Sequence, residues 1–193
     1  AFFLGGGRAL MNAYYNSAEQ LGVQVLYDTE ATELCIEDGV FRYAVVQYKG
    51  IRHEVYAEKL VLASGGFESN LEWLEEAWGE SARNFLIRGT QFNQGGMIKE
   101  MMRNGATIIG EPDQCHAVAI DGRAPKYDGG IVTRLDCVSF GIVVNENAER
   151  FYDEGEDFWP KRYAIWGRLV AQQPNQVGHV IIDSKAINDF MPS

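Results

Sequence analysis

The stretch Leu60-Val61-Leu62-Ala63-Ser64-Gly65-Gly66-Phe67-Glu68-Ser69-Asn70 decides how the rest of the chain is interpreted. Its first four residues, 60–63, form a short apolar run of the kind that a strand buried on both faces shows. The two glycines that follow have no Cβ, so another backbone or a flat ligand can approach them closely. We therefore predict a strand over 60–63 that ends at a docking place on a sheet edge. A plain tight turn is the alternative.

The segments before this stretch predict a helix and a small sheet. Apolar residues recur at helical spacing from Leu10 to Leu21 and predict an amphipathic helix that Gly22 ends. The triple glycine at 5–7 is either a flexible entry to this helix or a phosphate-binding loop, and the absence of a GxGxxG pattern favours the flexible entry. A strand is predicted over 23–27. Asp-Gly at 38–39 and Lys-Gly at 49–50 then predict an antiparallel meander.

The segments after it predict two helices and a change of domain. An acidic helix is expected from Asn70 to Trp78, and a second helix over 97–104 follows the glycine-rich loop 89–96. A strand over 106–109 closes this half, and we place the domain change near Gly110. Beyond it the chain is rich in aromatic residues and loops. A hairpin with its turn at 145–148, a strand over 178–183 and a helix capped by Ser184 are predicted there.

Composition excludes several classes of function. The chain has 193 residues, 46% hydrophobic and 23% charged, which is ordinary for a globular protein. A net charge of −10 argues against a nucleic-acid partner. No apolar run approaches the ~20 residues of a membrane span, and no signal peptide is visible, so we expect no membrane insertion. The odd number of widely spaced cysteines, Cys35, Cys115 and Cys137, suits a reducing cytoplasm.

The quoted stretch resembles the alanine-small-glycine-glycine-phenylalanine segment of the FAD-dependent fumarate reductase and succinate dehydrogenase flavoprotein family. The glycine-rich helix start at 5–7, the loop 89–96 and the hairpin around 145–148 fit the same family in the same order. The resemblance implies FAD as the cofactor and an α/β fold with mixed α+β character. We expect the central part of a Rossmann-like FAD-binding domain, with the antiparallel meander, over 1–110. An incomplete α+β capping domain that closes substrate onto the flavin is expected over 111–193.

No GxGxxG motif occurs in the sequence, although the flavoproteins of this type have it near their N-terminus. The resemblance therefore implies an internal piece of a larger enzyme that by itself holds FAD weakly or not at all. The family relation also assigns cofactor-binding residues. The backbone near Ala31 is expected to meet the adenine, and the dinucleotide is expected to pass a glycine-rich set: Ala63, Ser64, Gly65, Gly66 and Gly96. Gly95 stands where the family has an aspartate, which leaves that position only a backbone role.

The resemblance also implies a substrate site for carboxylates. His116 keeps the glutamine-x-histidine context of a carboxylate-binding histidine; the alternatives are a surface loop histidine or a single metal ligand, and the lack of further ligands nearby argues against metal. Thr133 lies twelve residues before Asn145, as the family's substrate-binding threonine does from its hairpin asparagine. Arg134 replaces a glutamate of the family's proton pathway. A guanidinium there can hold one more carboxylate, which suits a tricarboxylate, but it puts that proton route in doubt.

Arg162 is our expected proton-transfer residue. The family has an arginine four residues after a glutamate, and here Arg162 comes eight residues after Glu154, with Lys161 as the alternative. Arginine is a poor base unless the site lowers its pKa. The aromatic residues of this stretch, among them Trp166, are expected to pack the lid.

The function that the resemblance implies is dehydrogenation of a CH–CH bond in a polycarboxylate, with tricarballylate going to cis-aconitate. The flavin accepts a hydride, and the protein supplies a base and groups that hold carboxylates. The partners would be a small polycarboxylate and an electron acceptor, with a membrane-associated protein as one candidate; no metal is expected. The alternatives are a fumarate reductase or a 3-ketosteroid dehydrogenase of the same fold, and a non-catalytic binding module.

Overall fold

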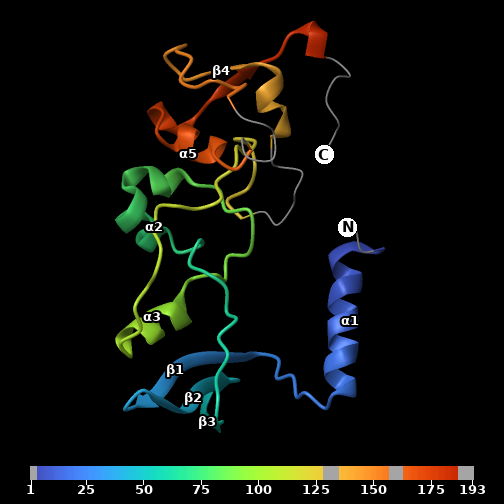
Figure 1. The fold of residues 1–193 in the computed structure, drawn as a ribbon, viewed down its shortest axis with the longest axis vertical. Coiled ribbons are helices and arrows are strands. Elements are labelled where there is room, and N and C mark those ends of the chain that lie inside the picture. Colours follow the sequence, from blue (N-terminus) through green and yellow to red (C-terminus); the bar gives the residue numbers. More distant parts are fainter. Residues whose placement is uncertain (1–3, 128–134, 157–162, 187–193) are drawn as a thin grey trace. The chain divides into compact units, whose positions relative to one another are not determined.

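The computed structural model describes residues 4–127, 135–156 and 163–186. Within these ranges the helices are α1 (Gly6–Gln20), α2 (Leu71–Trp78), α3 (Gly96–Arg103) and α5 (Trp166–Ala171), and the strands are β1 (Thr29–Glu37), β2 (Val40–Tyr48), β3 (Ile51–Tyr56), β4 (Ile142–Val144) and β5 (His179–Ile181) (Figure 1). The chain divides into two compact units, 1–61 and 62–193. The domain change that the sequence suggests near Gly110 stays a prediction.

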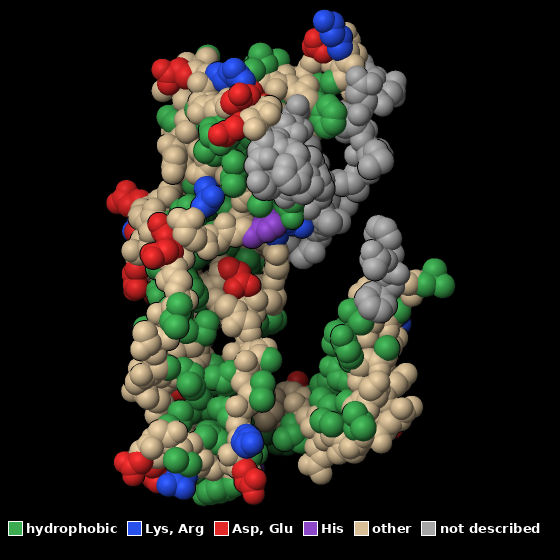
Figure 2. All heavy atoms as spheres, viewed as in Figure 1, with side chains coloured by type: hydrophobic (Ala, Val, Ile, Leu, Met, Phe, Trp, Pro, Cys, Tyr) green, Lys and Arg blue, Asp and Glu red, His purple; other side chains and the backbone are tan. Residues whose placement is uncertain are grey.

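Helix α1 confirms the amphipathic helix that the spacing predicted. It ends where Gly22 adopts a left-handed φ of 72°, a conformation that costs glycine little. None of its residues is buried. Tyr14 is 62% exposed and Leu21 is 80% exposed. The space-filling view shows hydrophobic side chains uncovered along this helix (Figure 2).

The antiparallel meander is confirmed, and its strands follow one another in the order β1-β2-β3. Both connections are two-residue turns with positive φ at both positions, Asp38-Gly39 and Lys49-Gly50. Turns of this kind match the right-handed twist of the strands they join, so the register follows from the turn chemistry. Leu34, Ala44 and Val45 are buried in the sheet.

The second unit opens with a small core around α2. Asn70 caps this helix, because its side-chain oxygen accepts a hydrogen bond of 3.0 Å from the Trp73 N–H. Leu74, Ala82 and Ile87 form a buried cluster that phenylalanine and tryptophan side chains surround. The Lys126 ammonium stabilises the segment that follows α2, because it donates hydrogen bonds to the carbonyl oxygens of Arg83 (3.0 Å) and Phe85 (2.6 Å).

A second core lies under the β4–β5 pair. Val138, Val143 and Trp166 are buried together, and both Phe151 and Tyr152 meet the Trp166 ring edge-on. The predicted hairpin is present: the Ala148 N–H donates to the Asn145 carbonyl at 3.0 Å. The packing role expected for Trp166 is confirmed.

Three predicted strands do not form in the described residues. Segments 23–27, 60–63 and 106–109 run without a ladder of backbone hydrogen bonds. A strand needs a neighbour that accepts and donates along its whole length, and apolar composition alone cannot supply one. The strand over 178–183 does form, shortened to β5, and pairs with β4. The helix expected after Ser184 begins as a 3₁₀ turn, Ser184–Ala186, and its remainder lies outside the described residues.

No helix in the described parts of the chain combines the length and the apolarity that crossing a membrane requires.

Candidate functional site

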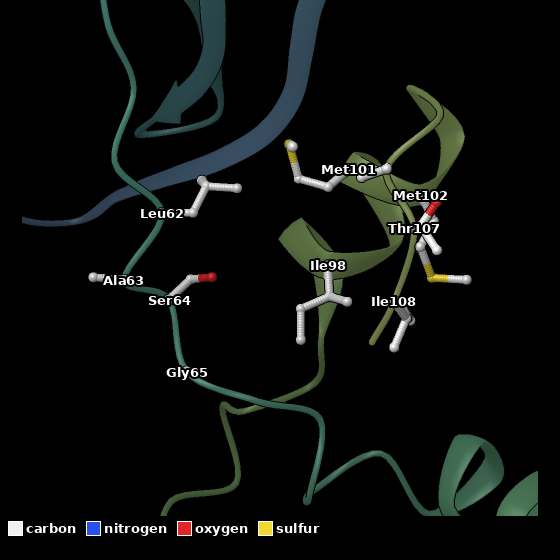
Figure 3. Close-up of a pocket in the computed structure, with 10 residues that line it drawn as sticks. Leu62, Ala63, Ser64, Gly65, Ile98, Met101, Met102, Thr107 and Ile108 are labelled. Carbon is white, nitrogen blue, oxygen red and sulfur yellow. The ribbon is translucent and has the colours of Figure 1, made fainter. Parts of the chain in front are cut away.

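The segment after residue 61 faces helix α3 across an open apolar pocket of about 250 Å³. Leu62 and Ser64 point toward α3, whereas Ala63 points away from it (Figure 3). Met101 extends toward Leu62 from the other side. The complete lining is Leu62, Ala63, Ser64, Gly65, Ile98, Met101, Met102, Ala106, Thr107 and Ile108. Three residues of the predicted cofactor set, Ala63, Ser64 and Gly65, therefore lie at this pocket.

Hydrogen bonds of Ser69, three residues after the glycine pair, tie this segment to the loop 89–96. The Ser69 N–H donates to the Asn93 carbonyl at 3.0 Å, and the Gln94 side chain donates to the Ser69 carbonyl at 3.0 Å. Gly65 has a φ of 77°, and a Cβ on it would meet Asn93 Oδ1 at 2.7 Å. Gly65 is thus needed for the conformation of the segment and for its close approach to the loop.

Gly95 is where the chain departs from the family's aspartate, and the structure gives a local reason. Its φ is 73°, and a Cβ would collide with the Trp73 ring and lie 2.7 Å from Phe67 Cβ. Phe67 and Trp73 stack at 4.1 Å between ring centroids, and the Lys99 ammonium lies 4.8 Å from the Trp73 ring centre. An aspartate does not fit against this stack in the conformation observed.

The residues present suit a flat dinucleotide. Gly96 begins α3, and a Cβ on it would meet nothing within 4 Å, so the backbone there is open to a ligand. The first N–H groups of an α-helix lack partners within the helix and can face phosphate oxygens. Small residues at the end of the 60–66 segment and the apolar lining leave room for a ring system. Ala31 lies in β1, opposite Val46, in the other compact unit.

A second cluster gathers around His116. Its imidazole lies 5.0 Å from the Tyr163 ring, centroid to centroid, at an angle of 59°. Two residues earlier, Gln114 accepts a hydrogen bond from the Arg168 guanidinium. Burial raises the pKa of the intervening Cys115 thiol, and the charge of Arg168 acts against that rise. His116 itself is exposed.

Gly167 fixes how the two segments of this cluster meet. Its N–H donates to the Ala117 carbonyl at 3.0 Å, and the Ala117 N–H donates to the Ala164 carbonyl at 3.2 Å. A Cβ on Gly167 would lie 2.5 Å from the Ala117 carbonyl carbon and 2.7 Å from the Val118 nitrogen. The absence of a side chain at 167 therefore lets the histidine-bearing segment rest on the start of α5.

Glu154, eight residues before Arg162 in the sequence, is held in place by hydrogen bonds from Val143 and Arg150. Its carboxylate is buried and accepts from the Val143 N–H at 2.7 Å and from the Arg150 Nε at 2.9 Å. Burial alone would raise the pKa of Glu154, but the hydrogen bonds from Arg150 and Val143 outweigh it and hold that pKa below its usual value. Arg150 is half exposed at its side chain.

The predicted substrate and proton-transfer residues are only partly visible. Thr133, Arg134, Lys161 and Arg162 lie outside the described residues, so their roles stay predictions. Arg168 is a residue of the candidate site that the sequence analysis did not assign. The pairing of Arg168 with Gln114 spans 54 positions, and no local pattern signals it. Across the described ranges, no three His, Cys, Asp or Glu side chains gather as a metal site would need.

Solved structures with this fold are known. A flavocytochrome c3 fumarate reductase in an open conformation matches with a TM-score of 0.66 and 18% identity over 93% of this chain. The 3-ketosteroid-Δ4-(5α)-dehydrogenase from Rhodococcus jostii RHA1, in complex with 4-androstene-3,17-dione, matches with a TM-score of 0.69 and 23% identity over 93%. The 3-ketosteroid Δ1-dehydrogenase from Sterolibacterium denitrificans, in complex with 1,4-androstadiene-3,17-dione, matches with 0.63 and 23% over 82%. This chain spans about a third of each, 30%, 34% and 28% respectively.

The family model for the FAD binding domain matches residues 3–186, nearly the whole chain. At these identities the solved structures speak for the fold alone, whereas the family match bears on the cofactor. It confirms the FAD prediction that the Gly65-Gly66 segment supported. The chain therefore belongs to the FAD binding domain family, and FAD is its cofactor.

Proposed function

We propose that the protein is an FAD-dependent dehydrogenase that oxidises a CH–CH bond of a polycarboxylate to a double bond. The proposed reaction turns tricarballylate into cis-aconitate, as in tricarballylate dehydrogenase, which the stretch from Arg150 to Gly167 resembles most specifically. Bound FAD would supply the hydride acceptor for this oxidation, and the segment Ala63 to Gly66 would help to hold it. The protein's share is to hold the carboxylates and to take the proton from the neighbouring carbon.

One observation carries the substrate class. His116 and Arg168, an imidazole and a guanidinium, belong to one cluster in a chain whose net charge is −10. Both groups can donate hydrogen bonds to carboxylate oxygens, and charge-assisted bonds of this kind are about twice as strong as neutral ones. The Arg168 cation beside the segment that carries His116 favours an anionic substrate over a neutral steroid.

The remaining roles are assigned from the sequence. Thr133 would hold a carboxylate through its hydroxyl, and Arg134 would grip a further one through its fork of donors. Arg162, or Lys161 beside it, would take the proton. The electrons would pass to an acceptor, with a membrane-associated protein as one candidate. The odd cysteine count supports a cytoplasmic location.

The test is turnover of the full-length, flavin-loaded protein on tricarballylate with an artificial electron acceptor. Wild type is compared with Arg134→Glu, which restores the family's acid. A sharp fall in activity with FAD still bound supports Arg134 as a carboxylate clamp. Absence of turnover by flavin-loaded wild type overturns the tricarballylate assignment.

The same assay separates the alternatives. Turnover of fumarate, with a reduced donor dye, would indicate a fumarate reductase, and turnover of a 3-ketosteroid would indicate a steroid dehydrogenase. Because the fold is similar to that of two steroid dehydrogenases, the assay must include a 3-ketosteroid. A preparation that binds no flavin under any condition would favour a non-catalytic module.

A further inference from the structure

We propose that Arg168 is a second carboxylate-binding residue, acting beside His116 and selecting substrates with more than one carboxylate. The proposal rests on the proposed function and adds to it a specificity-determining residue. It starts from the contact between Arg168 and Gln114, which places the guanidinium beside the segment that carries His116.

The backbone makes this placement rigid. Gly167, directly before Arg168, donates to the Ala117 carbonyl, directly after His116, at 3.0 Å. The Ala117 N–H returns a bond of 3.2 Å to the Ala164 carbonyl, next to Tyr163. Arg168 and His116 therefore each lie one residue from the same backbone hydrogen bond, and neither can shift far from the other without breaking it.

Arg168 retains hydrogen-bonding capacity that the described residues do not use. A guanidinium has five N–H donors in a planar fork. Within the described ranges only Nη1 finds a partner, on Gln114, and the buried Nε has none. No carboxylate in these ranges forms an ion pair with it, although Asp113 lies near enough to influence Cys115.

A buried donor without a partner costs free energy, and a carboxylate oxygen is the acceptor that best matches a guanidinium fork. Gln114 holds the guanidinium through Nη1, and Nη2 has no partner among the described residues, so Nη2 is the donor that remains for a carboxylate oxygen. A neutral ligand would leave the charge of Arg168 uncompensated. The chemistry of the cluster thus matches a ligand with at least two separate carboxylates, one for His116 and one for Arg168.

The experiment uses the full-length, flavin-loaded protein. Equilibrium binding of tricarballylate is followed through the perturbation of the flavin absorbance, so no turnover is needed. Arg168→Met is compared with His116→Ala and with Arg123→Met, a control in which the replaced arginine is 90% exposed at its side chain and pairs only with Asp121 among the described residues. We expect Arg168→Met to raise the Kd about 10- to 100-fold and to flatten its salt dependence, and Arg123→Met to change neither.

Each outcome decides something. If His116→Ala weakens binding but Arg168→Met leaves the Kd and its salt dependence unchanged, Arg168 is only structural and the inference is wrong. If wild type binds no polycarboxylate, the proposed function fails as well, and the two failures are distinguishable. If Arg168→Met loses FAD, Arg168→Lys is measured instead. Weaker tricarballylate binding at normal flavin content supports a role for the Arg168 guanidinium, and unchanged tricarballylate binding contradicts it.

Discussion

Gly167 lies so close to Ala117 that a Cβ on the glycine would approach the Ala117 carbonyl carbon to 2.5 Å. Real Cβ atoms do not tolerate this distance from backbone, so the contact exists only because residue 167 has no side chain. The contact also joins the segment that bears His116 to the helix that bears Arg168. The way these two segments meet therefore depends on the absence of a side chain at residue 167.

Replacement of Gly167 by alanine should disturb both stability and the site. The added methyl group overpacks a backbone contact, and we expect a loss of about 1–3 kcal/mol in the free energy of unfolding. Tricarballylate binding should weaken too, because His116 moves away from Arg168. Chemical denaturation and flavin-monitored binding of the full-length protein measure the two effects.

Gly122→Ala is the matched control for this variant. A Cβ at Gly122 meets nothing within 4 Å, and its backbone does not require glycine. We expect its stability to stay within about 0.5 kcal/mol of wild type. Equal effects of the two substitutions would contradict the role assigned to the Gly167 contact.

Local features of the fold could be predicted, because local chemistry determines them. Asp38-Gly39 specified its hairpin turn, and the Asn70 side chain specified the start of α2. Segment 60–63 is the opposite case. Its apolar run predicted a strand, but a strand depends on a neighbour, and no described segment bonds to it.

The same division holds for the candidate site. Ala63, Ser64 and Gly65 could be assigned from one contiguous motif, and they do lie at a pocket. The Arg168–Gln114 contact joins positions far apart in the sequence, and no local sequence pattern near either residue predicts it. The close approach of Gly95 to Trp73 is likewise a fact of packing, so the sequence showed the departure from the family pattern but not its reason.

The substitution Gly95→Ala tests whether the close approach of residue 95 to the Trp73 ring requires a glycine. The substitution forces a residue with a side chain to a φ of 73°, at a cost of about 1–2 kcal/mol, and pushes its methyl group into the Trp73 ring. We expect lower stability and a lower FAD content. Gly96→Ala provides the contrast, because its methyl group enters open space inside a helix. That variant should keep its stability and lose FAD only if the backbone at Gly96 approaches the cofactor, so a loss of FAD at normal stability identifies cofactor contact.

Asn70→Ala removes the cap of α2. The Trp73 N–H then loses its acceptor, and the side-chain bond of 3.1 Å from Asn70 to the Gln94 carbonyl is lost as well. We expect a destabilisation of about 1–2 kcal/mol. Asn70→Asp keeps the accepting oxygen and loses only the bond to Gln94, so it should fall between wild type and alanine in the midpoint of chemical denaturation. Identical midpoints for the two variants would mean that the cap contributes nothing.

Glu154→Gln tests the buried pair below the hairpin through its pH dependence. The pKa of Glu154 is lower in the folded protein than its ordinary value of 4.5, so its ionised form contributes stability above that value and loses it as the pH falls through the folded pKa. Glutamine can still accept from the Val143 N–H but carries no charge for Arg150. At pH 7 we expect the variant to be less stable by about 1–3 kcal/mol, and the difference should shrink as the pH falls below about 4.5. Asp153→Asn is the control, because Asp153 is exposed and lies 3.6 Å from Arg150. A stability difference between wild type and Glu154→Gln that stays constant from pH 7 to pH 3 would show that packing, not the charge, accounts for the loss.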